Sequence, residues 1–172
     1  MEIAELNSRI RADIPSVGDM RLEVVSADAA RVVVRIPADG NGNDKGTLFA
    51  GVTYSGLVLA GWCLAMARAR ESGFARPWAA IVDAHVTYAK PLRADAEAVA
   101  VFAEEPHLVP GARNWANVSV SIGSEVVFTG RYAVGKSVKW RVRRGWFWYN
   151  ASCEPPLATG WTGGAGRNRR LT

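Results

Sequence analysis

Apolar and polar positions alternate in six segments of the chain, a pattern typical of antiparallel strands with one buried face. In the last segment, Val126, Phe128, Tyr132 and Val134 are expected to share that face. Gly123-Ser124, before it, is typical of a tight hairpin. The six segments are residues 20–24, 32–36, 78–88, 96–104, 115–122 and 125–134.

Helical spacing describes two further segments. Ile3, Leu6 and Ile10 predict a short amphipathic helix over residues 2–12, ended by Pro15. Residues 46–67 carry no charge. Residues 51–72 are therefore predicted to form one long apolar helix of about 33 Å, with Gly73 at its C-terminal end.

The long apolar segment is also long enough to cross a bilayer. Its first half is rich in Gly, Thr and Ser, and the segments around it alternate like strands of a water-soluble sheet. We therefore expect no membrane span. The pattern predicts an α+β fold, in which an antiparallel sheet wraps around one long central helix. The first residues lack the apolar stretch of a secretory signal, which predicts a cytoplasmic location.

Charge divides the chain near residue 135. The formal net charge is +5, but residues 136–172 carry +7 and residues 1–135 carry −2. This basic tail, rich in Trp and Gly, has little periodicity, and we expect it to be poorly ordered beside a single domain at 1–135. The charge therefore says nothing about the domain's ligand, and no nucleic-acid partner is predicted. Cys63 and Cys153 provide no disulfide framework or metal-ligand spacing, so no metal is expected.

A polar loop leads directly into the long helix, and residues 41–51 (NGNDKGTLFAG) are the most informative stretch. The first turn of a helix presents unpaired N–H groups and a partial positive charge. Gly51 has no side chain to obstruct a thioester carbonyl that approaches those groups. By spacing alone, Asn43, Asp44 and Thr47 also fit simple turn and capping roles.

The stretch NDKGTLFAGVTYSGLVLAGW, followed by IVDAHVTYAKP, resembles the thioesterases found as the C-terminal domain of YiiD-type acetyltransferases, which belong to the hotdog superfamily. The resemblance covers about residues 15–135. It implies a hotdog fold and a homodimer, or a dimer of dimers, with ligand sites at the subunit interface. It also implies an acyl thioester of coenzyme A or of acyl carrier protein as the ligand, so coenzyme A would be part of the substrate and no separate cofactor is expected.

The chain departs from the superfamily in one respect. Many hotdog thioesterases carry His-Gly-Gly at the helix start and an acidic residue about two turns later. Here residues 49–51 are Phe-Ala-Gly, and residues 57–59 offer no carboxylate. Glu71 lies roughly 30 Å along the helix from its start. A general base must therefore come from elsewhere.

Asp44 is the first candidate for that base, since it lies close in sequence to the helix start and could activate water. Asn43 could position the water or bind the carbonyl oxygen. Asp83 and His85 form a rival acid–base pair, because residues two apart on a strand share a face. The alternative for this pair is the polar outer face of the sheet.

The remaining site candidates would bind substrate rather than react with it. Bulky Trp62 and Met66 are candidates to close the far end of an acyl tunnel along the helix, which suggests short to medium chains. The substrate-binding candidates are Thr47, Phe49, Tyr54 and Ser55 around the helix start, with Lys90 and Arg93 for coenzyme A phosphates.

The sequence thus favours hydrolysis of an acyl thioester. Two alternatives stay open. A non-hydrolytic acyl-thioester-binding protein is favoured by the missing helix carboxylate. A hotdog dehydratase or hydratase would need an imidazole and an acid that converge on the acyl chain, and Asp83 and His85 are its only plausible source.

Overall fold

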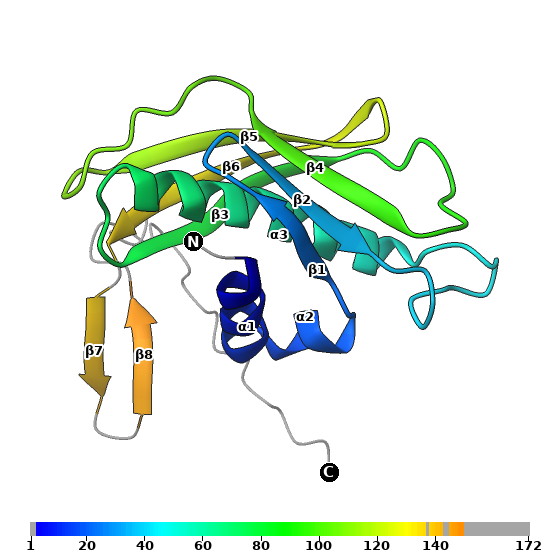
Figure 1. The fold of residues 1–172 in the computed structure, drawn as a ribbon, viewed down its shortest axis with the longest axis horizontal. Coiled ribbons are helices and arrows are strands. Elements are labelled where there is room, and N and C mark those ends of the chain that lie inside the picture. The colour runs from blue at the N-terminus through cyan, green and yellow to red at the C-terminus, as the bar shows by residue number, and fades with distance from the viewer. Residues whose placement is uncertain (1–2, 137, 143–144, 150–172) are drawn as a thin grey trace, which may run out of the picture.

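The computed structural model describes residues 3–136, 138–142 and 145–149. Both predicted helices and all six predicted strands are present, which confirms the α+β fold (Figure 1). The elements are α1 (Ile3–Asp13), α2 (Pro15–Asp19), β1 (Glu23–Ala27), β2 (Arg31–Ile36), α3 (Ala50–Glu71), β3 (Pro77–Val86), β4 (Ala96–Phe102), β5 (Asn114–Ile122), β6 (Glu125–Lys136), β7 (Val138–Val142) and β8 (Gly145–Tyr149).

The six-stranded sheet has the order β1-β2-β4-β5-β6-β3, and all its neighbouring strands are antiparallel. It arches over α3, which lies along its concave side, while α1 and α2 lie below (Figure 1). At the β1 edge, the buried Asn7 side chain of α1 donates to the Val24 carbonyl (2.8 Å) and accepts from the Val24 N–H (2.9 Å). The β3 edge has no paired strand among the described residues.

Close packing against the sheet encloses α3. It contacts all six strands of the sheet, and Ala96, Ala98 and Ala100 are buried on β4. A Cβ at Gly56 would lie 2.5 Å from Ile36 Cδ1, so glycine lets the Ile36 side chain approach the helix without a shift. The Tyr132 ring lies against Gly61 in the same way.

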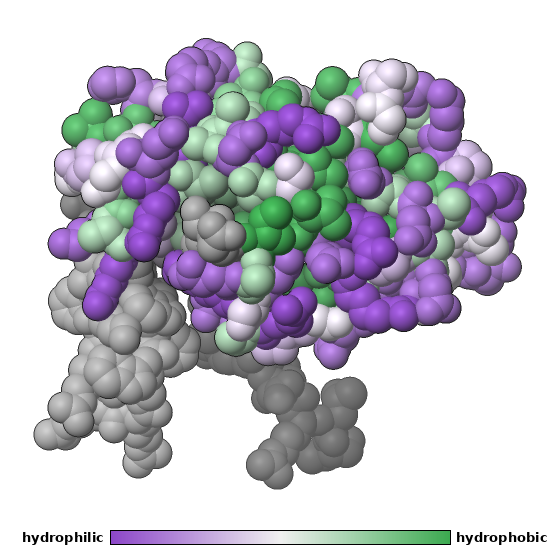
Figure 2. Space-filling view, viewed as in Figure 1, coloured by the Kyte–Doolittle hydropathy of each residue, from purple (hydrophilic) through white to green (hydrophobic). Residues whose placement is uncertain are grey.

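The length and composition of α3 would let it cross a membrane, but most of its apolar window is buried inside the protein. Hydrophilic residues cover much of the surface seen in Figure 2, with an apolar area in the middle of the view where β1 and β2 cross α3. Burial against the sheet identifies α3 as the core helix of the domain.

α1 ends at Asp13, before Pro15, as predicted, and Pro15 also begins α2, where its missing N–H costs nothing. Two other local predictions are wrong. Met20 precedes β1 and is not part of it. Val126 is 62% exposed and does not share a face with Phe128. The β5–β6 register pairs Val120 with Phe128 and Ser121 with Val126, so Val127 forms a bulge that turns Val126 outward.

Beyond residue 136, the structure describes only the paired strands β7 and β8. The expected poor order of the tail, and the predicted role of its charges, fall mainly on residues outside the described ranges.

Candidate functional site

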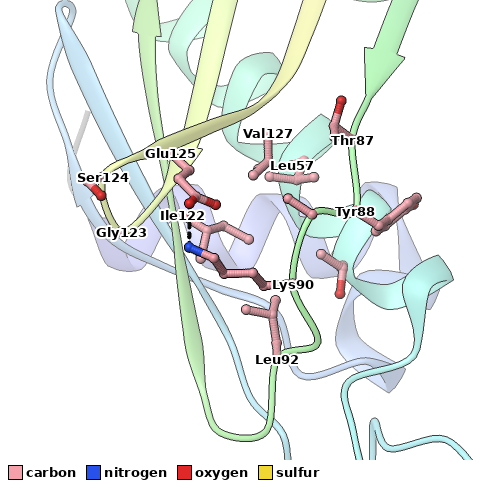
Figure 3. Close-up of a pocket in the computed structure, with 12 residues that line it drawn as sticks. Leu57, Thr87, Tyr88, Lys90, Leu92, Ile122, Gly123, Ser124, Glu125 and Val127 are labelled. Carbon is pink, nitrogen blue, oxygen red and sulfur yellow. Dashed lines mark hydrogen bonds and ion pairs between the residues drawn. The ribbon is translucent and has the colours of Figure 1, made fainter.

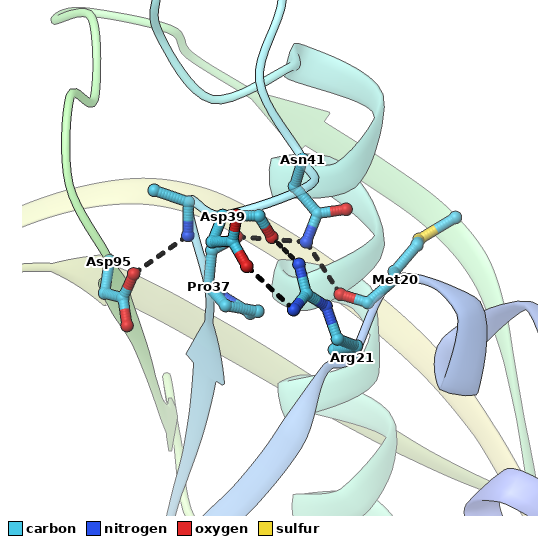
Figure 4. Close-up of polar contacts among 7 residues, drawn as sticks. Met20, Arg21, Pro37, Asp39, Asn41 and Asp95 are labelled. Atoms are coloured by element: carbon cyan, nitrogen blue, oxygen red, sulfur yellow. Dashed lines mark hydrogen bonds and ion pairs between the residues drawn. The ribbon is translucent and has the colours of Figure 1, made fainter.

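Buried polar contacts hold the loop that leads into α3 (Figure 4). The Asn41 amide nitrogen donates to the carbonyls of Met20 (2.7 Å) and Pro37 (3.0 Å), and the Asn41 carbonyl accepts from the Phe49 N–H (2.9 Å). Arg21 pairs with Asp39 at 3.0 Å on the exposed side of the same loop. The start of the helix therefore has a defined position relative to α2 and β2.

The tip of this loop is a turn organised by Asn43. Its side-chain oxygen accepts from the N–H groups of Lys45 (2.9 Å) and Thr47 (3.2 Å), and its N–H donates to the Thr47 carbonyl (2.8 Å). The side chains of Asn43 and Thr47 are thus engaged with each other. Asp44 lies exposed on this turn, and no hydrogen bond or ion pair joins its carboxylate to the described residues.

The N-terminus of α3 has no side-chain cap and no acidic residue in its first turn. No described side chain bonds the N–H groups of Ala50, Gly51 and Val52, which have no partner within the helix. A Cβ at Gly51 would lie 2.5 Å from the Phe49 ring. Gly51 therefore makes room for that ring, which is itself 55% exposed.

The chain after β3 returns to the helix start. The Leu48 N–H donates to the Leu92 carbonyl (2.8 Å), and the Tyr88 hydroxyl donates to the Ala50 carbonyl (3.2 Å). Partial desolvation, together with the neighbouring Tyr54, raises the pKa of Tyr88 above its ordinary value.

A cavity of about 230 Å³, here called cavity A, lies beside these contacts (Figure 3). It separates the start of α3 from the β5–β6 hairpin, and the Lys90 ammonium pairs with Glu125 across it. Lys90 therefore lines cavity A with its charge paired to Glu125. Arg93 is exposed in the same connection. The lining of cavity A includes Thr53 and Leu57 of α3, and Tyr88, which follows β3.

A second cavity of about 240 Å³, cavity B, lies on another side of α3. Its lining is mostly apolar. Ser55 donates to the Gly51 carbonyl (2.9 Å), and Tyr132 donates to the Val58 carbonyl (2.9 Å), so both hydroxyls are satisfied. Tyr54 and Ser55 thus line a cavity near the helix start. The residues that line cavity B are Ile14, Ser16, Val17, Met20, Tyr54, Ser55, Val58, Leu59, Trp62, Ile81 and Tyr132.

Asp83 and His85 share one face of β3, but not the face that contacts α3. Asp83 pairs with Arg131 and His85 with Thr129, while Ile81 pairs with the buried Tyr132. Opposed residues of an antiparallel pair point to the same side, so Asp83 and His85 lie on the outer face. Within one chain the structure does not bring them to the start of α3.

The described residues contain neither a reactive thiol nor a group of metal ligands. Cys63 is fully buried, and burial raises the pKa of its thiol far above neutral pH. Among the described residues, no group of three His, Cys, Asp or Glu side chains could hold a metal ion.

Two residues of the site escaped sequence reasoning. Asn41 was read only as part of a polar loop, although a buried Asn with backbone partners fixes the path of that loop. Tyr88, at the end of the predicted strand over residues 78–88, had no predicted role. Its position directly after an alternating run, at the strand end, was the available signal.

The fold agrees with comparisons to known proteins. Residues 3–136 match the family described as "Putative thioesterase (yiiD_Cterm)", and the chain belongs to that family. This confirms the resemblance on which the hotdog assignment was based.

Solved structures share the fold. A structure described as a putative thioesterase from Shewanella oneidensis is 21% identical, with a TM-score of 0.63 over 76% of this chain and 95% of the other. A thioesterase from Haemophilus influenzae is 14% identical, with a TM-score of 0.58 over 78% and 90%. Zebrafish thioesterase superfamily member 2 is 20% identical, with a TM-score of 0.54 over 78% and 96%.

Proposed function

We propose that this protein hydrolyses an acyl thioester of coenzyme A or of acyl carrier protein. The observation that carries the proposal is the N-terminus of α3. Its first N–H groups have no bonding partner among the described residues, and the residues of α3 that follow them line two cavities. Membership of a thioesterase family supports the same reaction. The cytoplasmic location remains a prediction from the sequence.

The proposed oxyanion site consists of the N–H groups of Ala50, Gly51 and Val52. When water attacks the thioester carbonyl, negative charge develops on its oxygen. Donors held by a helix stabilise that charge without reorganisation, and the partial positive charge of the helix end adds to the effect. Because the first turn contains no acidic residue, nothing in it opposes an anion.

Asp44 is the proposed general base. The loop that carries it is held on both sides of the turn, by Asn41 and by the bridge between Gly42 and Leu48. Its carboxylate has no bonding partner among the described residues, so it is available to accept a proton from water. The engaged amide of Asn43 then serves to fix the turn rather than to bind the carbonyl.

The substrate-binding assignments follow from the two cavities. Cavity B, with Tyr54 and Ser55 near its opening, is proposed to receive the acyl chain. Cavity A and the exposed side chains of Lys90 and Arg93 are proposed to meet the head group, where cations would pair with phosphates. Phe49 would cover the thioester at the helix start. No bound group is required beyond the substrate itself.

We further propose that two copies pair along β3. This ten-residue strand ends the sheet, and residues 82–85 are exposed in succession. A long unpaired edge readily accepts another strand. The neighbouring apolar side chains Val82 (48% exposed) and Tyr88 (52%) would be covered in such a dimer. A monomer in light scattering at micromolar concentration would contradict this arrangement.

A non-hydrolytic acyl-binding protein is the second candidate. It is favoured by Leu57, Val58 and Leu59, which occupy the helix positions where many relatives carry a carboxylate, and by the outward position of Asp83 and His85. Because Asp83 and His85 lie on the outer face, they cannot serve within one chain as the acid and imidazole that a dehydratase or hydratase would need.

Release of free thiol from acyl-coenzyme A substrates, from acetyl to palmitoyl, tests the main proposal. Wild-type protein is compared with Asp44→Ala and with Asp83→Ala, which tests the rival carboxylate. Loss of a general base lowers kcat by roughly 10²–10⁴-fold, so Asp44→Ala should lose at least 100-fold while Asp83→Ala retains activity. Binding without turnover, for both coenzyme A and carrier-protein thioesters, would instead establish the acyl-binding function.

A further inference from the structure

Cavity B has a defined far end. Trp62 and Ile14 line cavity B and also line a separate cavity of about 450 Å³, cavity C. These two side chains therefore form the wall between the cavities. Cavity C continues in the same direction along α3, where Met66 lines it one turn beyond Trp62.

Hydrogen bonding holds the Trp62 side of this wall in place. The indole N–H of Trp62 donates to the Ala79 carbonyl of β3 at 3.0 Å. A partly buried indole with its one donor satisfied has little freedom to turn aside. Met66 is almost fully buried and does not line cavity B. Of the two residues that the sequence suggested, only Trp62 closes cavity B.

The size of cavity B limits the chain that fits. An apolar cavity of about 150 Å³ holds benzene, so about 240 Å³ has room for roughly ten carbons. Along the helix axis, Trp62 lies about 16 Å beyond Gly51. An extended chain advances roughly 1.2 Å per bond, which gives a limit of roughly thirteen bonds. Both estimates describe an acyl chain of medium length.

We propose that Trp62 is the residue that limits acyl-chain length, and that cavity B accepts chains of roughly eight to twelve carbons but not sixteen. This inference rests on the proposed use of cavity B by the acyl group. The wall formed by Trp62 and Ile14 excludes longer chains from cavity C, and its removal joins the two cavities into one tunnel.

The test compares Trp62→Ala with wild type on decanoyl- and palmitoyl-coenzyme A. Each additional buried methylene strengthens binding roughly fourfold. The palmitoyl-to-decanoyl ratio of kcat/KM should therefore rise at least tenfold when the wall is removed. Ile14→Ala opens the wall from its other side and should shift the ratio in the same direction, which provides a second route if Trp62→Ala does not fold.

Two control variants isolate the wall from general effects. Trp62→Phe keeps a ring in place and should preserve the wild-type chain-length preference. Trp115→Ala is a matched loss of a tryptophan on the outer face of the sheet, where Arg131 stacks on its ring at 4.4 Å, and should leave the ratio unchanged. Circular dichroism confirms the fold of each variant.

Binding separates this inference from the proposed function. Calorimetry with non-hydrolysable thioether analogues of acyl-coenzyme A, from eight to sixteen carbons, reports chain preference without turnover. A preference for medium chains that Trp62→Ala extends would support the inference even if no hydrolysis occurs. Three results would overturn the inference. Wild type could bind the ten-carbon and sixteen-carbon analogues equally well, or folded Trp62→Ala and Ile14→Ala could keep the wild-type preference. The third result is that no analogue binds.

Discussion

The two ends of α3 are built in opposite ways. At the C-terminal end, Gly73 adopts a φ of +88°, its N–H donates to the Arg70 carbonyl, and the Phe74 N–H donates to the Ala69 carbonyl. These are the two bonds of a Schellman motif, with Phe74 buried beside them. At the N-terminal end, Phe49 provides no cap and the first N–H groups have no partner among the described residues.

This difference shows which end is structural and which can bind. Arg68, near the C-terminal end, donates to the Ala29 carbonyl (2.9 Å) and pairs with Glu105 (2.8 Å), so its charge is used within the fold. Uncapped helix ends lower stability by about 1 kcal/mol. The missing cap at the N-terminal end is consistent with the oxyanion site proposed there.

Ala50→Asp should produce the largest effect, because it places a carboxylate in the uncapped first turn. Loss of one oxyanion donor lowers kcat roughly 10²–10³-fold, and a negative charge at this end should lower it about 100-fold. The same charge should raise the free energy of unfolding by about 0.3–1 kcal/mol. Steady-state kinetics and urea unfolding measure both quantities.

The control for this change is Ala50→Asn, which has nearly the same shape without the charge and should lose much less activity. Ala75→Asp, an exposed acidic substitution beyond the C-terminal end of α3, should leave kcat unchanged. Wild-type kcat in Ala50→Asp would mean that the helix N-terminus does not stabilise the reacting oxygen.

Gly73→Ala should affect stability alone. No atom lies within 4 Å of the added Cβ, so the loss of stability comes only from the left-handed backbone. Alanine also reduces the entropy of the unfolded chain, which offsets part of this loss and leaves a decrease of about 1 kcal/mol in the free energy of unfolding. Thermal unfolding should show the loss while kcat stays within twofold. Gly18→Ala, at ordinary φ and with its nearest neighbour at 3.7 Å, is the matched control and should be neutral or stabilising. A fall in kcat for Gly73→Ala would show that the two ends are not independent.

Tyr88→Phe should have a smaller effect at the N-terminal end. It removes the bond to the Ala50 carbonyl, which is long and partly exposed, so we expect about 0.5 kcal/mol of lost stability and a decrease in kcat/KM of a few-fold. Chemical denaturation and kinetics on one acyl thioester measure both. A 100-fold fall in kcat with the fold intact would instead give the Tyr88 hydroxyl a direct part in the reaction.

The sequence predicted the helices and strands because alternation and helical spacing depend only on residues that are close together in the chain. Alternation located all six strands, and the uncharged stretch located α3 within a residue of its observed start. The bulge at Val127 was not predictable, since it is a matter of register between β5 and β6. Pro15 ends the first helix as predicted, but the pattern did not show that it also begins a second helix, where proline is tolerated in the first turn.

The site was predictable only where it is local in sequence. The helix start and its loop are contiguous, so the sequence could single out residues 41–51 as one candidate region. The contact between Tyr88 and Ala50 joins residues 38 apart, and no sequence pattern specifies it. The shared face of Asp83 and His85 followed from alternation, but pairing with β6 determined that this face is the outer one.

Substitution of Asp28 should change stability less than the other variants do, and it tests the contacts around the C-terminal end of α3. Its carboxylate accepts from the Ala30 (2.7 Å) and Arg31 (2.6 Å) N–H groups, in the turn that Arg68 contacts through the Ala29 carbonyl. These two bonds, assisted by the charges of Arg31 and Arg68, hold the pKa of Asp28 below its ordinary value of 3.8.

A carboxyl whose pKa is lower in the folded protein stabilises it above the pKa of the unfolded chain, and this contribution disappears as the pH falls through the folded value. Asp28→Ala should therefore lower the free energy of unfolding at pH 7, and the difference from wild type should shrink as the pH falls below about 4. Asp28→Asn keeps an acceptor without the charge, so its deficit at pH 7 should be smaller than that of Asp28→Ala, and it should also shrink as the pH falls. If urea unfolding finds the same deficit for Asp28→Ala at pH 3 and pH 7, the charge of Asp28 does not support this end of α3.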